Sequence, residues 1–421
     1  MGIISDMLKR YSAFLLLFLL ASCSVSKKMI VSETPVDVVY APVNVSTATA
    51  EPISIHETKF RDVTYGLLLP MQLEEHFAPD TIPDDEPLIL PSSVPALNFY
   101  EGAISASAEF VSSVSKIKLQ VIDIGGDSLS TVLALSTKMK DTCDFYLSMV
   151  PANCNQSLVS FAKRCNRPVY ILSGSNTSIL EGNPNIWLSM PSNFTSLKEY
   201  SSFLYSSYFN SNFMLVYRDV RKENDLAAFI GSIIDSTSQK INTCVKVNYK
   251  SAGWAGITVK LSKTKRNVLI IPTNDESYLS TLVRKIDELS ADYDIMICGL
   301  PTWDAFETVD QSLLKKLNTH IFNGIYIDYS NINVLNFRQK FITNYHADPM
   351  APAFQAYDLI TYLTSNFEKV GYDFNRYVSK ATIEAPVGGF RFERVGANSG
   401  WENRNLSVLK YADYKYTRIN K

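Results

Sequence analysis

The sequence predicts an α/β protein with two Rossmann-like lobes, each built on a mainly parallel sheet. Short apolar runs rich in β-branched and aromatic residues alternate with helical patterns along most of the chain, and such alternation is typical of βαβ units. The run at 63–71 (VTYGLLLPM) is apolar almost throughout, as expected for a strand that is covered on both faces. The expected strands are more than one open sheet usually holds, which favours two sheets.

The elements follow each other in two series. A proline-rich, acidic insertion at 72–95 is too long and irregular for an ordinary connection within the first series. The first series has strands at 63–71, 118–124, 145–150 and 168–172, and helices at 96–112, 128–138 and 156–164. The second series has strands at 185–190, 213–217, 245–249, 268–272, 295–299 and 324–329, and helices at 197–208, 225–234, 252–261, 278–289 and 312–318. Residues 388–419 instead alternate as short antiparallel strands around a turn at 398–400.

The N-terminus carries the pattern of a secretory signal. A basic pair at 9–10 precedes an apolar run at 14–21, which is too short to span a bilayer. The ending at 20–23 (LASC) resembles the bacterial lipobox. This resemblance implies a lipoprotein signal peptide at 1–22 and acyl chains such as palmitate on Cys23. The alternative is an ordinary signal peptide followed by an accidental cysteine.

The segment after the signal predicts how the protein is held. Residues 23–59 would comprise the lipidated cysteine and a flexible tether, because they are rich in Val, Pro, Thr and Ser and lack helical periodicity. Ser24 follows the cysteine in place of an aspartate, which resembles the default for outer-membrane sorting. We therefore expect a lipid-anchored protein of the bacterial cell envelope, in the outer membrane and facing the periplasm.

Charge and composition argue against several function classes. The 40 basic and 42 acidic residues give a formal net charge of −2, without the basic excess that nucleic-acid binding usually requires. Four histidines are scattered over the chain, and the sequence has no nucleophile elbow, Walker loop or dinucleotide fingerprint. We therefore expect a protein that is not an enzyme and that needs neither cofactor nor metal.

Four short motifs resemble type I periplasmic binding proteins, the group that includes leucine-binding subunits of amino-acid ABC transporters. They lie at 98–103 (NFYEGA), 123–127 (DIGGD), 352–358 (PAFQAYD) and 388–392 (GGFRF). The resemblance covers about residues 61–421. The ending at 390–411 looks closest to the Bacteroidetes branch whose relatives often carry LysM repeats, although this chain shows no LysM segment.

The resemblance implies two lobes joined by three crossing segments, with the ligand in a cleft at the carboxyl ends of the parallel strands. Lobe one would hold residues 60–190 and 330–385, and lobe two residues 191–329 and 386–421. The crossings would fall near 191–193, 328–331 and 385–388.

The same resemblance implies candidate ligand contacts. Hydroxyls and N–H groups of the first lobe would bind a ligand carboxylate, and the matching residues are Asn153, Ser175, Asn176, Thr177 and Ser178. Plain capping and turn chemistry is the alternative for these residues. On the second lobe, an aromatic wall and a carboxylate would suit an amino group, and the matching residues are Tyr217, Trp303 and Asp304. Packing beneath a helix is the preferred alternative for Trp303. Relatives usually have an acidic residue where this chain has 299–301 (GLP).

Five cysteines remain beyond the anchor, so at least one thiol is expected outside any disulfide. Cys143, Cys154 and Cys165 lie close together in the sequence. We predict a Cys143–Cys154 bridge, because a helix separates Cys154 from Cys165. Cys244 and Cys298 are expected to behave as small buried apolar residues.

Two functions stay open. The slightly preferred one is a non-catalytic, membrane-anchored envelope binding protein that holds a ligand or partner in or around the cleft, as lipoprotein activators of peptidoglycan synthases do. The departure at 299–301, the insertion at 72–95 and the expected outer-membrane anchor favour it. The alternative is a substrate-binding lipoprotein of an amino-acid-type ABC transporter. The expected partner is an amino acid or cell-wall fragment, or else an envelope protein.

Overall fold

The computed structural model describes residues 62–76, 89–110, 116–137, 143–172, 176–237, 244–370 and 389–420. The predicted signal peptide, Cys23, the tether, residues 77–88 of the 72–95 insertion, Ser175 and the crossing at 385–388 lie outside these residues. The described strands form two sheets of seven, which confirms the predicted fold class.

The first sheet has the strand order β11-β12-β5-β4-β3-β1-β2. Its strands are β1 (Val63–Leu69), β2 (Ile117–Asp123), β3 (Phe145–Ser148), β4 (Val169–Ile171), β5 (Ile186–Leu188), β11 (Phe392–Arg394) and β12 (Trp401–Asn403). Neighbouring strands are parallel except for β11, which is antiparallel to β12.

The second sheet has the strand order β14-β13-β10-β9-β8-β6-β7. Its strands are β6 (Asn212–Tyr217), β7 (Val245–Asn248), β8 (Asn267–Ile270), β9 (Ile295–Cys298), β10 (His320–Asn323), β13 (Ser407–Ala412) and β14 (Lys415–Arg418). The strands β6 to β10 are parallel to one another, whereas β13 is antiparallel to β10 and to β14.

Helices connect the strands of both sheets. The α-helices are α2 (Leu73–His76), α3 (Val94–Glu109), α4 (Ser128–Thr137), α5 (Asn155–Cys165), α6 (Asn193–Ser207), α7 (Arg221–Thr237), α8 (Tyr249–Thr258), α9 (Glu276–Leu289), α10 (Gln311–Lys316), α11 (Ile332–Tyr345) and α12 (Ala351–Val370). The 3-10 turns are η1 (Ala152–Cys154), η2 (Thr177–Leu180) and η3 (Pro301–Ala305).

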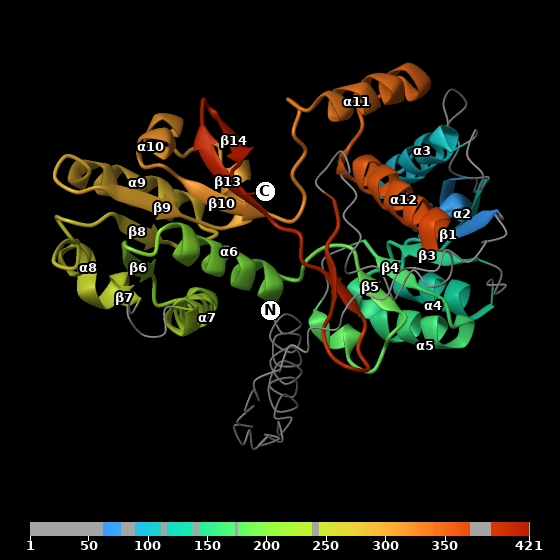
Figure 1. The fold of residues 1–421 in the computed structure, drawn as a ribbon, viewed down its shortest axis with the longest axis horizontal. Helices are drawn as coiled ribbons and strands as arrows, with labels where there is room; N and C mark the ends of the chain where they lie inside the picture. The colour runs from blue at the N-terminus through green and yellow to red at the C-terminus, as the bar shows by residue number, and fades with distance from the viewer. Residues whose placement is uncertain are drawn as a thin grey trace, which may run out of the picture. The chain divides into compact units, whose positions relative to one another are not determined.

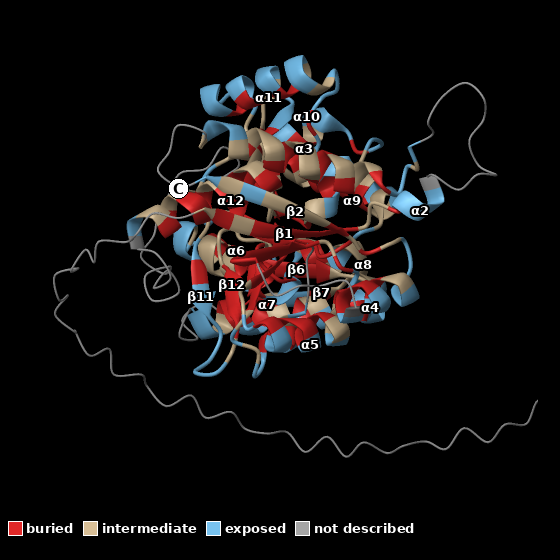
Figure 2. Cartoon of the chain, turned by 90° about the vertical axis from the view of Figure 1, so that its right-hand side faces the viewer, coloured by how far each residue is buried: buried red, intermediate tan, exposed pale blue. Residues whose placement is uncertain are grey.

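Side-chain alternation in β1 explains how the first sheet is covered. Tyr65 and Leu67 pack into a core with α3 and α12, whereas Leu68 packs with α4 and α5, because successive side chains of a strand point to opposite faces. Figure 1 shows these two helix pairs on the two faces of the sheet. Figure 2 shows the result as buried strands enclosed by helices with exposed outer faces.

The strand predicted at 324–329 is wrong, because the chain forms β10 four residues earlier. All four residues of β10 pair with β13, from His320 opposite Lys410 to Asn323 opposite Ser407. His320 is fully buried. Its Nδ1 donates to the Asn318 carbonyl at 2.7 Å, and its Nε2 accepts from the Tyr208 hydroxyl at 3.0 Å. Burial lowers the pKa of His320 to about 4, so the ring is a neutral part of the core.

The C-terminal strands are divided between the sheets, whereas we expected all of 386–421 in lobe two. β11 and β12 extend the first sheet beside β5, and β13 and β14 belong to the second sheet. The physical reason is aromatic packing across the β5–β12 pair. The Trp187 and Trp401 rings stack with centroids 4.8 Å apart, and Phe392 packs edge-on against Trp187 at 5.2 Å.

A buried carboxylate joins β12 to the start of α6. Glu402 is 1% exposed. Its oxygens accept from the Ser192 backbone N–H and the Thr195 hydroxyl, both at 2.8 Å. Arg404 lies 3.8 Å away as its ion-pair partner. These contacts link the segment that leaves the first sheet after β5 with the strand that returns to it.

The predicted Cys143–Cys154 disulfide is absent. Each of the five described cysteines is a buried thiol outside any disulfide. The Cys143 Sγ donates to Gln120 Oε1 at 3.4 Å, while the Cys154 Sγ faces the Ser128 carbonyl at 3.8 Å. The two thiols therefore pack against different partners. Burial raises the pKa of Cys244 and of Cys298 to about 12, as expected for inert apolar thiols.

The contact between α3 and α12 gives a test of the first core. A Cβ at Gly102 would overlap the backbone of Ala353, including its carbonyl oxygen. Gly102→Ala should therefore lower the free energy of unfolding by about 1–3 kcal/mol, although alanine in an open helix position would raise it by about 1 kcal/mol. Urea unfolding checks this result, with Ala108→Gly on the exposed side of the same helix as control. A stabilised Gly102→Ala protein would contradict the close approach.

Candidate ligand-binding site

Backbone groups at the carboxyl end of β1 are fixed by Asp123, the last residue of β2. Asp123 Oδ1 accepts from the backbone N–H groups of Met71, Gln72 and Gly125 at 3.0, 3.1 and 2.9 Å. Its Oδ2 accepts from the Leu73 N–H at 2.7 Å. The carboxylate thus holds two neighbouring strand ends together. The aspartate of the motif at 123–127 was the available sequence signal for this role.

The predicted first-lobe contacts make local hydrogen bonds. Asn153 is exposed, and its Nδ2 donates to Ser128 Oγ at 2.7 Å. Asn176 caps η2, since its Oδ1 accepts from the Ser178 backbone N–H at 3.1 Å. Thr177 is half-buried and Ser178 exposed. These contacts follow turn and capping chemistry, and a ligand role for these residues stays a prediction.

On the second sheet, the residue after Tyr217 organises the strand ends. Tyr217 itself is half-buried and packs against the core. The Arg218 side chain donates from Nε to Glu223 Oε1 at 3.1 Å and from Nη1 to Asp275 Oδ2 at 2.8 Å. Its guanidinium lies over the Tyr278 ring, 4.4 Å from the centroid. Thr273 Oγ1 donates to Glu223 Oε1 at 2.8 Å. The four partners come from α7, α9 and the β8–α9 loop.

The charged side chains of this group are paired with one another. Hydrogen bonding to Glu223 raises the pKa of Arg218, with Asp275 adding to the effect. The Tyr278 backbone N–H, and then Arg218, lower the pKa of the Asp275 carboxyl. One cation therefore lies between two carboxylates. A ligand ammonium at this position would meet carboxylates that are already occupied by an arginine.

Trp303 and Asp304 lie in η3, but they have different surroundings. Trp303 is 2% exposed. Its Nε1 donates to the Thr273 carbonyl at 2.9 Å, and its ring covers Gly299, so the packing alternative describes it best. Asp304 is exposed. Both residues line a cavity of about 350 Å³ that they share with the segment after β10 and the β13–β14 hairpin.

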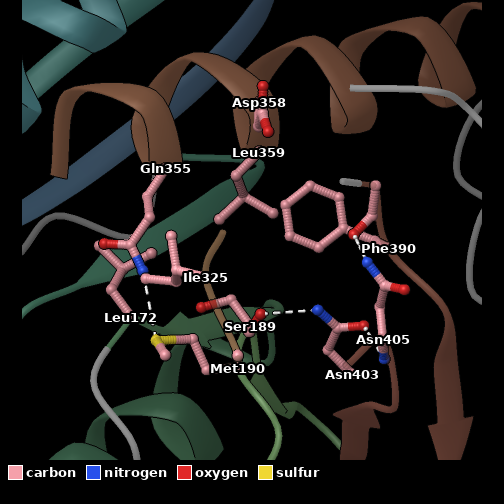
Figure 3. A pocket seen from close by; sticks show the side chains of 12 residues that line it. Leu172, Ser189, Met190, Ile325, Gln355, Asp358, Leu359, Phe390, Asn403 and Asn405 are labelled. Carbon is pink, nitrogen blue, oxygen red and sulfur yellow. Dashed lines mark hydrogen bonds between the residues drawn. The ribbon is translucent and has the colours of Figure 1, made fainter. Parts of the chain in front are cut away.

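A second, much smaller cavity lies where the chain crosses between the sheets (Figure 3). Its volume is about 40 Å³, which is enough for one or two waters but not for an amino acid. Figure 3 shows Gln355 reaching from α12 toward Met190, and its Nε2 donates to the sulfur at 3.2 Å. Asn403 Nδ2 donates to the Ser189 carbonyl at 2.9 Å. These bonds fix the crossing segments to one another.

Comparisons with solved structures define the fold class. A protein from Rhodospirillum rubrum assigned to a branched-chain amino acid ABC transporter matches with a TM-score of 0.62 and 10% identity, over 86% of this chain and 99% of its own. A Burkholderia xenovorans branched-chain amino acid ABC transporter periplasmic ligand-binding protein gives 0.53 and 12%, over 85% and 95%. A Desulfitobacterium hafniense ABC transporter substrate-binding protein in complex with Leu gives 0.51 and 13%, over 85% and 100%.

The chain therefore has the type I periplasmic binding protein fold. No protein-family model matches the sequence, and no curated protein matches it either. Among the described residues, no helix combines the length and apolarity needed to cross a bilayer. Nor do the described parts of the chain hold a group of three or more His, Cys, Asp or Glu side chains placed to bind a metal ion.

The arginine group at the end of β6 gives a stability test. Glu223 is 4% exposed, so Glu223→Gln leaves Arg218 partly desolvated without its main counter-ion. We expect the free energy of unfolding to fall by about 3 kcal/mol, measured by chemical denaturation. Asp225→Asn removes the same charge from an exposed position of the same helix and should change it by less than about 0.5 kcal/mol. Equal effects of the two variants would mean that the pairing contributes nothing.

Proposed function

We propose that this chain is a non-catalytic solute-binding protein that captures a small polar ligand at the carboxyl ends of its two parallel sheets. The observation that carries the proposal is the fold itself, which matches ABC transporter substrate-binding proteins over 85% or more of the chain. Parallel sheets of this kind bind ligands beyond the carboxyl ends of their strands. An amino acid is the first ligand to test, because one of these similar proteins holds Leu.

A second candidate is an envelope binding protein that engages another protein or a cell-wall fragment. One observation favours it over amino-acid capture. Glu223 and Asp275 at the ends of β6 and β8 are both paired with Arg218, and the turn after β9 is Gly299-Leu300-Pro301. A free amino acid would therefore find both carboxylates at the ends of β6 and β8 already paired.

The N-terminal anchor also belongs to this proposal. The lipobox-like sequence at 20–23 supports acylation of Cys23 in a bacterial envelope, and Ser24 supports the outer membrane. The ending at 390–411 supports the Bacteroidetes branch. These features concern how the protein is held and do not alter the ligand site.

Acylation of Cys23 is tested by metabolic labelling with a palmitate analogue in a bacterial host. The wild-type protein should incorporate the label and partition into the detergent phase, because acyl chains supply the membrane affinity. Cys23→Ser should lose both properties, whereas Cys143→Ser, a buried thiol in the folded part, should keep them. Labelling of the Cys23→Ser protein would exclude this anchor.

Ligand capture is tested by thermal unfolding of the purified protein with single amino acids and with muropeptides. A ligand present at 100 times its dissociation constant should raise the free energy of unfolding by about 2.7 kcal/mol, which is seen as a higher melting temperature. N-acetylated amino acids serve as control, because they lack the α-ammonium group. If no small molecule raises the melting temperature while an envelope protein is recovered by crosslinking, the solute-binding proposal fails and the second candidate stands.

A further inference from the structure

Three loops lie at the edge of the second sheet where its parallel strands begin. They lead into β6, β8 and β9 and comprise residues 208–211, 259–266 and 290–294. At the starts of these strands, Asn212 lies opposite Asn267, and Asn267 lies opposite Ile295, so the three loops adjoin. The proposed ligand site lies at the carboxyl ends of the same strands. The edge formed by the three loops is therefore a separate surface.

The loop before β8 is shaped by the fully buried side chain of Asn267. Its Oδ1 accepts from the Ser262 N–H at 2.7 Å and from Asn212 Nδ2 at 2.9 Å. Its Nδ2 donates to the carbonyls of Ser262 and Asp294 at 2.9 and 3.1 Å. Asn212 Nδ2 also donates to the Lys260 carbonyl at 2.9 Å. Because these buried amides are satisfied by loop backbone, they restrain the loop and join it to its neighbours.

The restrained loop presents a cluster of basic side chains. They are Lys260, Lys263, Lys265 and Arg266. The three lysines are exposed, and none of them forms an ion pair with a described residue. Arg266 Nε donates to Asp294 Oδ2 at 3.0 Å, and Asp292 is the other carboxylate of the three loops. This edge of the sheet therefore keeps an excess of positive charge.

Two exposed apolar side chains accompany the lysines. Phe209 is 65% exposed, and Val259, at the start of the lysine loop, is 75% exposed. Phe209 lines a hollow of about 300 Å³ together with Lys265, Arg266 and several hydroxyl-bearing side chains. Exposed apolar residues beside a basic cluster are typical of surfaces that contact anionic lipid.

We propose that this edge of the second sheet contacts a membrane surface containing anionic phospholipids, with the three lysines at the phosphate groups and Phe209 and Val259 in the interface. Each lysine near such a surface gains from its negative potential, and apolar side chains gain by leaving water. A nucleic acid or free phosphate would use the lysines but would leave both apolar side chains in water. The proposed anchor at Cys23 would keep a bilayer within reach, although the contact itself is built from the folded part.

The contact is tested through the environment of position 209 in the full chain with Phe209→Trp. Its emission, after subtraction of the wild-type spectrum, should shift to shorter wavelength with vesicles of phosphatidylglycerol and phosphatidylethanolamine, because the indole enters the interface. Vesicles of phosphatidylcholine alone should cause no shift, and high salt should abolish it by screening the lysines. The signal comes from position 209, so it distinguishes this contact from anchorage at Cys23.

The role of the lysines is tested by replacing all three with glutamine in the Phe209→Trp protein. About tenfold more anionic lipid, or a larger excess, should then be needed for the same shift. The matched control is Lys163→Gln, Lys198→Gln and Lys222→Gln, which removes the same charge from exposed lysines of α5, α6 and α7 and should leave the titration unchanged. Equal melting temperatures of the two triple variants exclude misfolding as the cause.

The proposal is overturned if anionic vesicles leave the emission unchanged, if phosphatidylcholine vesicles act equally, or if the two triple variants titrate alike. Inorganic phosphate alone should not shift the emission, and a shift with it would assign the hollow to free phosphate instead. Calorimetric binding of polyglutamate without any shift on vesicles would assign the lysines to an acidic protein and would also overturn the proposal.

Discussion

Glu402 is the contact on which the path of the chain between the two sheets depends. Its carboxylate is removed from water, so it would cost several kcal/mol if its partners were lost. The backbone of Ser192 and the hydroxyl of Thr195 satisfy it from the start of α6, while Arg404 neutralises it from its own strand end. The Glu402 carboxylate therefore fixes both the start of α6, which leads to the second sheet, and β12, the strand that returns to the first sheet. Around it, Arg391 and Glu199 add a half-exposed ion pair at 3.2 Å that contributes little by itself.

The second half of the chain treats its charged groups in two ways. At the end of β6, Arg218 is enclosed by two carboxylates and an aromatic ring. Both carboxylates are therefore already paired and are not free to bind a ligand. Before β8, three exposed lysines form no ion pair with any described residue. The first arrangement stabilises the scaffold. The second leaves interaction free energy available for binding, because an unpaired cation gains from any anion that reaches it.

Much of the fold could be predicted from local pattern, because a strand buried on both faces is apolar along almost its whole length, as β1 is. Pairing between distant segments could not. The alternation at 390–411 predicted antiparallel strands, but the choice of β5 as partner of β12 depends on Trp187 and Trp401, which are far apart in the sequence. Likewise the apolar residues after Gly324 resemble a strand, but the strand forms from the four residues before it, because these are the residues that pair with β13.

The candidate site was predictable to a similar extent. The polar residues named from the sequence lie in the loops after the strands, and their ligand role stays a prediction. The dominant group, Arg218 with Asp275, joins residues that no local motif connects. Asp304 was named because the family resemblance pointed to the loop after β9, several residues beyond the strand end at Cys298. Its tyrosine neighbours come from the hairpin about a hundred residues later, and a single sequence does not reveal that contact.

The division of the last strands between the sheets has a consequence for the order of folding. β12 pairs with β5 and β13 pairs with β10, so β5 and β10 remain edge strands until these last strands have been synthesised. Segments made early must wait for partners made last, and such long-range pairing slows folding. Until then, the exposed edges of β5 and β10 are open to pairing with other chains. A product that stops before β12 would therefore leave β5 and β10 as exposed edge strands, and we expect it to be bound by chaperones or degraded by proteases.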